Sequence, residues 1–283
     1  MNELQFNLLS SDRTQRMQKF LWDVARPLYS PFSKFLRRRL GQGYSDHPEM
    51  NLPPAFEAVQ LEAERRLHHY LHVDPSEIRK IIIVGTHEGA EVPRLRLAYP
   101  QSSYLCFEAS PHWHALLLKK FGKQPWFECR NIAVTDHVGA LTFHELPMPG
   151  NGSILPPDPQ RWAEFNLQVE YDVHSYRVNC STLDEETVEG DAIDLLWVDV
   201  QGAEGKVLAG ATSLLERTSA LLLEFAMVES PYQGATLFKD LNDMLEARGF
   251  SCVSLGCDPW NFSGNALWIR NVSSKVCANP GVA

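Results

Sequence analysis

The chain has 283 residues, of which 44% are hydrophobic and 22% charged, which favours one large α/β domain, with or without an extension, over two full domains. Its formal charge of -9 is unevenly spread, because residues 1–50 hold 8 Lys or Arg against 5 Asp or Glu and the remainder holds 18 against 30. An acidic main body argues against nucleic acid as the principal partner.

The cysteines and the apolar runs indicate the compartment. Six cysteines are scattered without a CxxC pair, several of them in apolar runs, which predicts reduced core thiols. The sequence opens without a basic segment followed by an apolar one, and its apolar runs stay well below the roughly 18 residues that span a bilayer. We therefore expect a cytoplasmic protein.

The N-terminal part has helical patterning and a basic segment. Residues 34–40 combine Lys and Arg with apolar neighbours, so two interpretations stay open: a solvated helix face, which we favour, and peripheral contact with an anionic membrane. Farther on, apolar residues recur at helical spacing between residues 56 and 71 and predict an amphipathic helix docked on the main domain. We place an extension at 1–75, the main domain at 76–272 and a tail at 273–283.

Short apolar runs alternating with helix-length segments follow. Seven of them read as strands: Ile81–Val84, Tyr104–Phe107, Trp126–Val134, Asp194–Val198, Ala220–Phe225, Phe250–Leu255 and Ala266–Arg270. Strands that alternate with helices predict parallel βαβ units in a doubly wound α/β sheet. The last two runs leave no room for a helix between them, so we expect an antiparallel hairpin at the sheet edge.

A glycine turn follows the first predicted strand. In Ile83-Val-Gly85-Thr86-His87-Glu-Gly89, the glycines let the backbone approach a ligand, and the next helix offers free N–H donors. This arrangement suits a negatively charged group such as a carboxylate. The dinucleotide fingerprint GxGxxG is absent. Simple turn chemistry explains the pattern about equally well.

Polar residues also end the next two strands. Glu108, followed by Ala109, comes about 20 residues after the glycine turn, where an acid can accept both ribose hydroxyls of a nucleoside cofactor. A helix cap or a solvated acid is the alternative. Asn131 and Ala133 close the third strand, and ligand contact and a plain strand end are nearly equal interpretations there.

Carboxylates gather around the fourth main strand. Asp199 ends the run Leu196-Trp-Val-Asp199, Glu204 opens the next helix, and Glu224 lies on the expected neighbouring strand. These oxygens could accept a proton, orient a hydroxyl or hold a divalent metal. We favour the metal-free interpretation, because the helix dipole alone favours an acid at Glu204 and Glu224 suits a structural role.

Residues 147–175 have the composition of a long irregular loop. Loops of this length inside a compact domain are usually functional, so we expect a lid or a substrate contact here. Trp162 in this segment could stack on a sugar or cover an acyl chain, although packing is the commoner role of such a residue.

Taken in order, these motifs resemble the signature of the FkbM-type methyltransferases over about residues 80–270. The resemblance implies a class I methyltransferase fold, S-adenosyl-L-methionine (SAM) as cofactor, and methylation of a hydroxyl on a saccharide, a glycolipid or a secondary metabolite. With the interpretation of the residues above, it predicts a cofactor site and a catalytic group. The expected cofactor residues are Gly85, Thr86, His87, Gly89, Glu108, Ala109, Asn131, Ala133 and Asp199, and the strand-end carboxylates Asp199, Glu204 and Glu224 are the expected catalytic residues.

The glycine turn departs from the family pattern. The family usually has Asp where Ile83 stands, Ala at Thr86 and Asn at His87. The missing acid leaves the SAM amino group without its usual contact, so either His87 or Glu88 compensates or the affinity is weak. Two other functions therefore stay open: a SAM- or nucleoside-binding protein without catalysis, and a nucleotide-sugar or dinucleotide enzyme of related fold.

Overall fold

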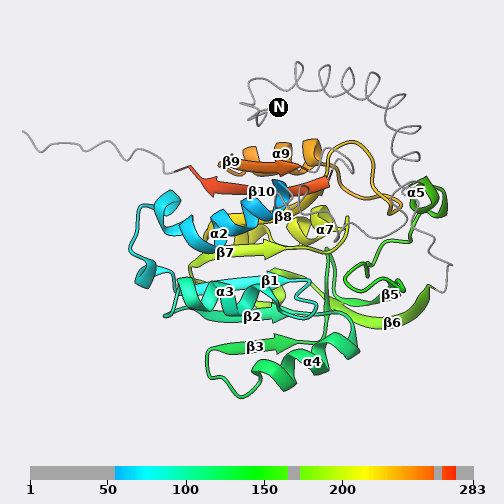
Figure 1. Ribbon diagram of the computed structural model, residues 1–283, viewed down its shortest axis with the longest axis horizontal. Helices are drawn as coiled ribbons and strands as arrows, with labels where there is room; N and C mark the ends of the chain where they lie inside the picture. The colour runs from blue at the N-terminus through cyan, green and yellow to red at the C-terminus, as the bar shows by residue number, and fades with distance from the viewer. Residues whose placement is uncertain (1–54, 165–172, 258–262, 272–283) are drawn as a thin grey trace, which may run out of the picture. The chain divides into compact units, whose positions relative to one another are not determined.

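A computed structural model describes residues 55–164, 173–257 and 263–271, and these described residues group as one compact unit (Figure 1). The helices are α2 (Ala55–Leu71), α3 (Glu91–Ala98), α4 (Pro111–Phe121), α5 (Pro159–Glu164), α6 (Leu183–Glu186), α7 (Glu204–Ala209), α8 (Thr212–Glu216) and α9 (Phe238–Glu246), with a 3-10 turn η2 (Pro75–Glu77). The strands are β1 (Lys80–Val84), β2 (Ser103–Phe107), β3 (Phe127–Arg130), β4 (Ala133–Val134), β5 (Gly139–Glu145), β6 (His174–Ser181), β7 (Ile193–Val198), β8 (Thr218–Ala226), β9 (Phe250–Cys257) and β10 (Ser263–Arg270).

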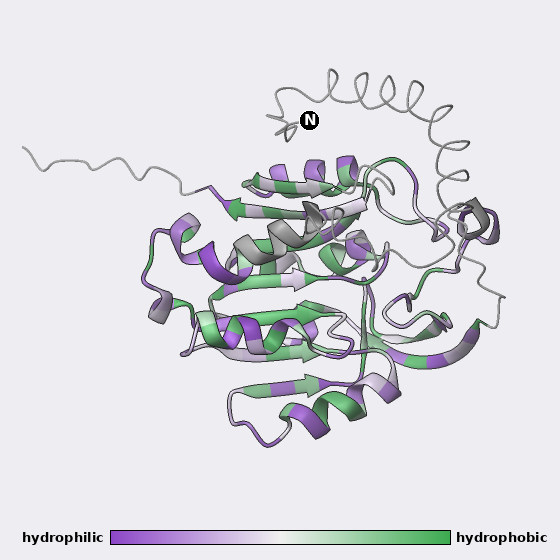
Figure 2. Cartoon of the chain, viewed as in Figure 1, coloured by the Kyte–Doolittle hydropathy of each residue, from purple (hydrophilic) through white to green (hydrophobic). Residues whose placement is uncertain are grey.

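A seven-stranded sheet organises the described part of the chain. Its order is β3-β2-β1-β7-β8-β10-β9. The five strands β3, β2, β1, β7 and β8 run parallel to one another, and β10 is antiparallel to both of its neighbours. The central strands are nearly uniformly apolar, as expected for strands buried on both faces (Figure 2). This confirms the predicted doubly wound α/β fold with an antiparallel edge hairpin.

Alternate residues of the strands enter two separate cores. Ile82 and Val198 belong to the core shared with α7, α8 and α9, whereas Ile81 and Ile83 belong to the core shared with α2, α3 and α4. The predicted N-terminal helix is confirmed as α2, which packs against β10, β9 and α3. Its Leu67 is fully buried, and the Leu67 N–H donates to the hydroxyl of Tyr99.

The run predicted as one strand at Trp126–Val134 is divided. β3 ends at Arg130, and β4 leaves to join a second sheet of order β4-β6-β5. The division occurs at Asn131, whose side-chain Nδ2 donates to the carbonyls of Glu108 and Ala109. The second sheet lies beside the carboxyl ends of the parallel strands (Figure 1).

Parts of the N-terminal and loop predictions lie outside the described residues. These include the basic segment 34–40, most of the predicted extension 1–75 and the tail 273–283. Within the described ranges, no helix is long and apolar enough to cross a membrane. The predicted loop 147–175 contains the short helix α5. Its Trp162 is buried against Tyr232, with ring centroids 5.7 Å apart, which favours the packing role.

Candidate functional site

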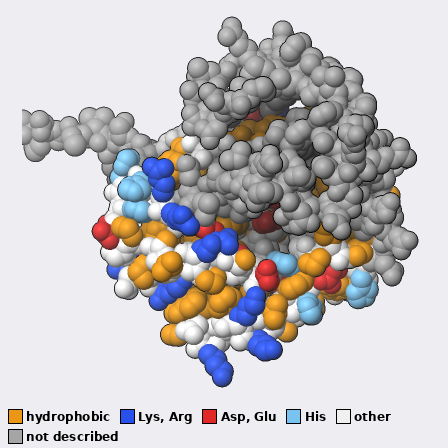
Figure 3. Space-filling view, viewed as in Figure 1, with side chains coloured by type: hydrophobic (Ala, Val, Ile, Leu, Met, Phe, Trp, Pro, Cys, Tyr) orange, Lys and Arg blue, Asp and Glu red, His pale blue; other side chains and the backbone are white. Residues whose placement is uncertain are grey.

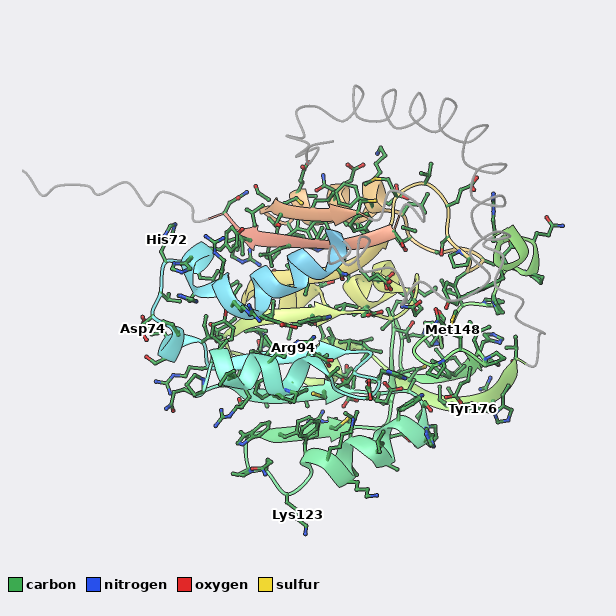
Figure 4. The ribbon with its side chains drawn as sticks, in the orientation of Figure 1. His72, Asp74, Arg94, Lys123, Met148 and Tyr176 are labelled. Carbon is green, nitrogen blue, oxygen red and sulfur yellow. The ribbon has the colours of Figure 1, made fainter. Side chains whose placement is uncertain are left out.

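A cavity of about 440 Å³ opens at the carboxyl ends of β1, β2 and β7. β1 lies between β2 and β7, so the chain direction across the sheet reverses at β1, and open α/β sheets bind ligands at such a switch point. The segment after β5, which includes Met148, forms an opposite wall (Figure 4). The volume of the cavity falls within the range of roughly 300–1,000 Å³ that is typical of small-molecule sites.

The glycine turn after β1 forms the floor of the cavity. Gly85 has φ +82°, and a Cβ atom there would lie 1.7 Å from the carbonyl oxygen of Asp199, so only glycine fits. The backbone N–H groups of Gly85 and Thr86 donate to the carbonyl of Phe107 at 3.0 and 3.3 Å. The turn is thereby fixed between the ends of β2 and β7.

Glu108 connects the end of β2 to the glycine turn. Its carboxylate accepts hydrogen bonds from the backbone N–H groups of His87 at 2.7 Å and Ser110 at 2.8 Å. Burial raises the pKa of Glu108 to about 7. The His87 ring packs on Trp113, with ring centroids 3.9 Å apart, and its Nε2 is buried without a partner among the described residues.

Asp199 lies beside Glu224 and Gln201 at the end of β7. Gln201 has φ +56°, and its side-chain amide donates to Asp199 Oδ1 at 2.8 Å and to Glu224 Oε2 at 2.6 Å. Burial and the neighbouring charges of Asp199 and Glu204 raise the pKa of Glu224 well above its usual range. The Tyr232 hydroxyl lies 3.3 Å from Gln201 Oε1 and 2.8 Å from the Asn151 carbonyl. Gln201, in the left-handed backbone conformation, thus bonds both Asp199 and Glu224. Backbone strain of this kind is often found at functional sites.

Glu204 supports the turn after Asp199 from inside the protein. It is 1% exposed, and its Oε1 accepts hydrogen bonds from the backbone N–H groups of Val200 at 3.1 Å and Gly202 at 3.2 Å. Burial raises the pKa of Glu204 to about 7. The carboxylate therefore contacts the backbone that carries Asp199 and Gln201.

The structure brings most of the expected site residues together. Those that line the cavity are Gly85, Thr86, His87, Gly89, Glu108, Ala109, Ala133 and Asp199. Asn131, Glu204 and Glu224 lie behind this lining, and each is bonded to a residue or turn that borders it. Among the described residues, no group of three or more His, Cys, Asp or Glu side chains is placed to hold a metal ion.

Sequence reasoning missed three polar residues of the site. Glu91, at the start of α3, lines the cavity, and so does Glu145, whose carboxylate accepts from Ser110 and from Tyr176 at 3.1 and 3.0 Å. Gln201 could have been identified from the motif Asp199-Val-Gln201-Gly, in which a polar residue precedes the glycine of the turn. For the two glutamates no local signal distinguishes them from solvated acids.

Acids with raised pKa values make the stability depend on pH. The pKa of Glu91 is about 8, those of Glu108 and Glu204 are about 7, and that of Glu224 is also raised. Unfolding returns each pKa to about 4.3, so above that pH the unfolded chain binds fewer protons than the folded one. The stabilisation is complete below the unfolded pKa and is lost as the pH rises through the folded pKa values.

We therefore expect the temperature at the midpoint of thermal unfolding to decrease as the pH is raised from about 5 to about 8. His87, whose pKa is lowered by burial, acts in the opposite sense, but only as the pH falls through its usual value of about 6.5. Melting curves across this range, followed by circular dichroism, check the prediction. Glu204→Gln should flatten the dependence, and Glu189→Gln, at an exposed loop position, should not. A midpoint that rises throughout would contradict these protonation states.

Comparison with known proteins decides the family. The family model described as the methyltransferase FkbM domain matches residues 84–252. The chain belongs to the FkbM methyltransferase family. A curated relative, the 2-O-methyltransferase NoeI of Sinorhizobium fredii, is 27% identical over 176 residues, which cover 58% of this chain and 70% of that protein.

Solved structures similar to this methyltransferase have low identity. The N-terminal domain of human METTL16 in complex with SAH has 12% identity and a TM-score of 0.44, covering 87% of this chain and 82% of that one. The Methanococcus jannaschii fibrillarin pre-rRNA processing protein has 15% identity and a TM-score of 0.40, covering 70% and 69%. The family membership, not these likenesses, identifies SAM-dependent methyl transfer as the activity.

The residues of the cavity fit SAM. The N-terminus of α3 and the glycine turn suit its carboxylate, Glu108 at the end of β2 suits its ribose, and the buried unpartnered oxygen of Glu91 suits a cation. The apolar side chains of Ile132 and Ala133 border the same space. The residues that depart from the family pattern in the turn, Thr86 and His87, line the cavity without filling it, and Ile83, which stands where the family has Asp, lies in the core.

Proposed function

We propose that the protein transfers a methyl group from SAM to a hydroxyl of a saccharide, a glycolipid or a secondary metabolite. The observation that carries the proposal is Asp199, held by Gln201 at the carboxyl end of β7, in the wall of the cavity that also contains the glycine turn and Glu108. A carboxylate in this place can orient a hydroxyl and accept its proton. The 2-O-methyltransferase activity named for the relative NoeI supports the same reaction class.

The lining supports an acceptor without negative charge. Acidic side chains in the wall are Glu88, Glu91, Glu108, Glu145 and Asp199, and the basic side chain Arg94 forms an ion pair with Glu64 at 2.7 Å. An anionic acceptor placed beside the Asp199 carboxylate would be repelled by it. The prolines and Met148 of the segment after β5 offer an apolar surface for the carbon skeleton of a sugar or a small metabolite.

In this mechanism each acid has a separate task. Bound SAM supplies an electrophilic methyl group on its sulfonium. Asp199 orients the acceptor hydroxyl and takes its proton, while Gln201 fixes the carboxylate through Nε2. Glu224, with its raised pKa, stays protonated beside Asp199, so a single negative charge is left at this place. Glu204 and Glu224 are thus positioning residues rather than groups that touch the acceptor, and the mechanism uses no metal.

Titration calorimetry with S-adenosylhomocysteine (SAH), beside NAD as a control ligand, is the first test. We expect micromolar binding of SAH and none of NAD, because the turn lacks the dinucleotide fingerprint. Acceptor assays with neutral saccharides, glycolipids and hydroxylated metabolites then follow the labelled methyl group. Binding of NAD in preference to SAH would support a dinucleotide enzyme, and SAH binding without turnover on any hydroxyl would contradict the proposed O-methylation.

Two related expectations stay predictions. We propose a cytoplasmic location, with the acceptor as the principal partner and nucleic acid excluded by the acidic main body. Lys and Arg side chains do occur on the visible face near α3 and α4, interspersed with apolar and uncharged ones (Figure 3). Peripheral contact of residues 34–40 with an anionic membrane is the alternative to a solvated helix face at that segment.

A further inference from the structure

Glu91 is an acid that neither the sequence motifs nor the proposed mechanism uses. It is the first residue of α3, and its Oε1 is fully buried without a hydrogen-bond partner among the described residues. The residue also lines the cavity beside the glycine turn. The same turn of helix carries Arg94, but its guanidinium is held by Glu64 of α2 at 2.7 Å.

An acid in this position is costly unless something pairs with it. Burial is the largest cause that raises the pKa of Glu91 to about 8, and the hydrogen bond from its own backbone N–H acts against it; the nearby Asp199 and Glu64 add to the shift, while Arg94 opposes it. The helix dipole and the hydrogen bond from its own backbone N–H favour an acid at the start of α3, but they leave Oε1 buried without a partner, which costs free energy. A cationic ligand in the cavity would give the carboxylate its partner.

The position of Glu91 matches the group that the turn lacks. Ile83, where the family has Asp, turns its side chain into the core that the sheet shares with α3, together with Val92 and Leu95. Glu91 begins the same helix and lies on the same side of β1. Glu91 of the adjacent helix α3 can therefore provide the carboxylate that β1 lacks at Ile83.

We propose that Glu91 binds the ammonium group of the methionine part of SAM, in place of the acid absent at Ile83. The inference rests on the proposed function, because it requires SAM in this cavity. It replaces the expectation that His87 or Glu88 compensates. The Glu88 carboxylate is exposed and pairs with Lys120 at 3.5 Å, and the His87 ring, whose pKa is lowered by burial, offers no negative charge to an ammonium group.

Calorimetry with two ligands tests this assignment. SAH carries the ammonium group, and 5′-methylthioadenosine lacks the whole amino-acid part. Glu91→Gln should weaken SAH binding at least about tenfold and leave 5′-methylthioadenosine binding unchanged, because only the charge-assisted contact is lost. Glu189→Gln, on an exposed loop, serves as the matched control and should change neither affinity.

Proton release gives a second readout that is independent of turnover. Near pH 7.5 Glu91 is largely protonated in the free protein, given its pKa of about 8, so pairing with an ammonium should expel that proton. The heat of SAH binding should then vary with the ionisation enthalpy of the buffer, and less so in Glu91→Gln. Asp199, Glu64 and Arg94, the other charged groups around Glu91, are unchanged in this variant and keep their contribution.

The outcomes separate this inference from the proposed function. If the wild-type protein binds no SAH, the proposed function and the inference both fail. If it binds SAH and Glu91→Gln binds it equally well with equal proton release, only the inference is overturned. A selective loss of SAH affinity in Glu88→Gln, with Glu91→Gln unaffected, would assign the ammonium contact to the exposed acid instead.

Discussion

Replacing Asp199 with Asn should lower the turnover number by about 10²-fold or more while changing SAH affinity only slightly. The amide keeps the size of the side chain, and its oxygen can still accept from Gln201 Nε2, which lies 2.8 Å from Asp199 Oδ1. It cannot take the proton of an acceptor hydroxyl. Steady-state kinetics and calorimetry on the same preparation, with SAH as ligand, measure the two effects separately.

The comparison variants define what would refute this role. Asp191→Asn changes an exposed acid before the amino end of β7, 3.9 Å from Lys80, and should leave both turnover and affinity unaltered. Gln201→Ala removes the donor shared by Asp199 and Glu224 and should lower turnover less than Asp199→Asn. Equal losses of turnover and of SAH affinity in Asp199→Asn would recast Asp199 as a cofactor residue.

The fold could be predicted because its signals are local. Runs such as Ile81–Val84 and Leu195–Val198 are apolar at every position, and a strand buried on both faces requires that pattern. The pairing of β7 with β8 followed from their order in the chain, and it placed Glu224 beside Asp199 correctly. The break at Asn131 escaped prediction, because the run Trp126–Val134 has no glycine or proline to mark it, and the two carbonyl groups that Asn131 contacts after β2 come near only in the folded chain.

The site was predictable only where a motif and a strand end coincide. Glu108 and Asp199 have both signals, and both line the cavity. Glu91 has neither, because an acid in the first turn of a helix is ordinarily explained by the helix dipole. Its burial results from packing between α3 and the rest of the domain. The Tyr232 hydroxyl contacts Gln201, although the two residues are 31 positions apart in the sequence, and no spacing pattern predicts that contact.

Glu108→Ala should weaken SAH binding by about tenfold or more, since a hydrogen bond to a charged group contributes about 1.5–3 kcal/mol. The physical reason is the loss of the buried carboxylate that accepts from His87 and Ser110 and is placed to accept from ribose hydroxyls. Calorimetry measures the affinity. Glu128→Ala, an exposed acid on β3, is the control and should bind SAH as the wild type does.

Because Glu108 also holds the glycine turn, a ligand series is needed to separate ribose binding from loop support. Wild-type protein should prefer adenosine to 2′,3′-dideoxyadenosine, and Glu108→Ala should lose that preference, whereas a purely structural role would weaken both ligands equally. The preference should also grow as the pH rises through about 7, since the pKa of Glu108 is about 7 and the ionised carboxylate is the stronger acceptor. An undiminished preference in the variant, or SAH affinity within about twofold of wild type, would remove Glu108 from the cofactor site.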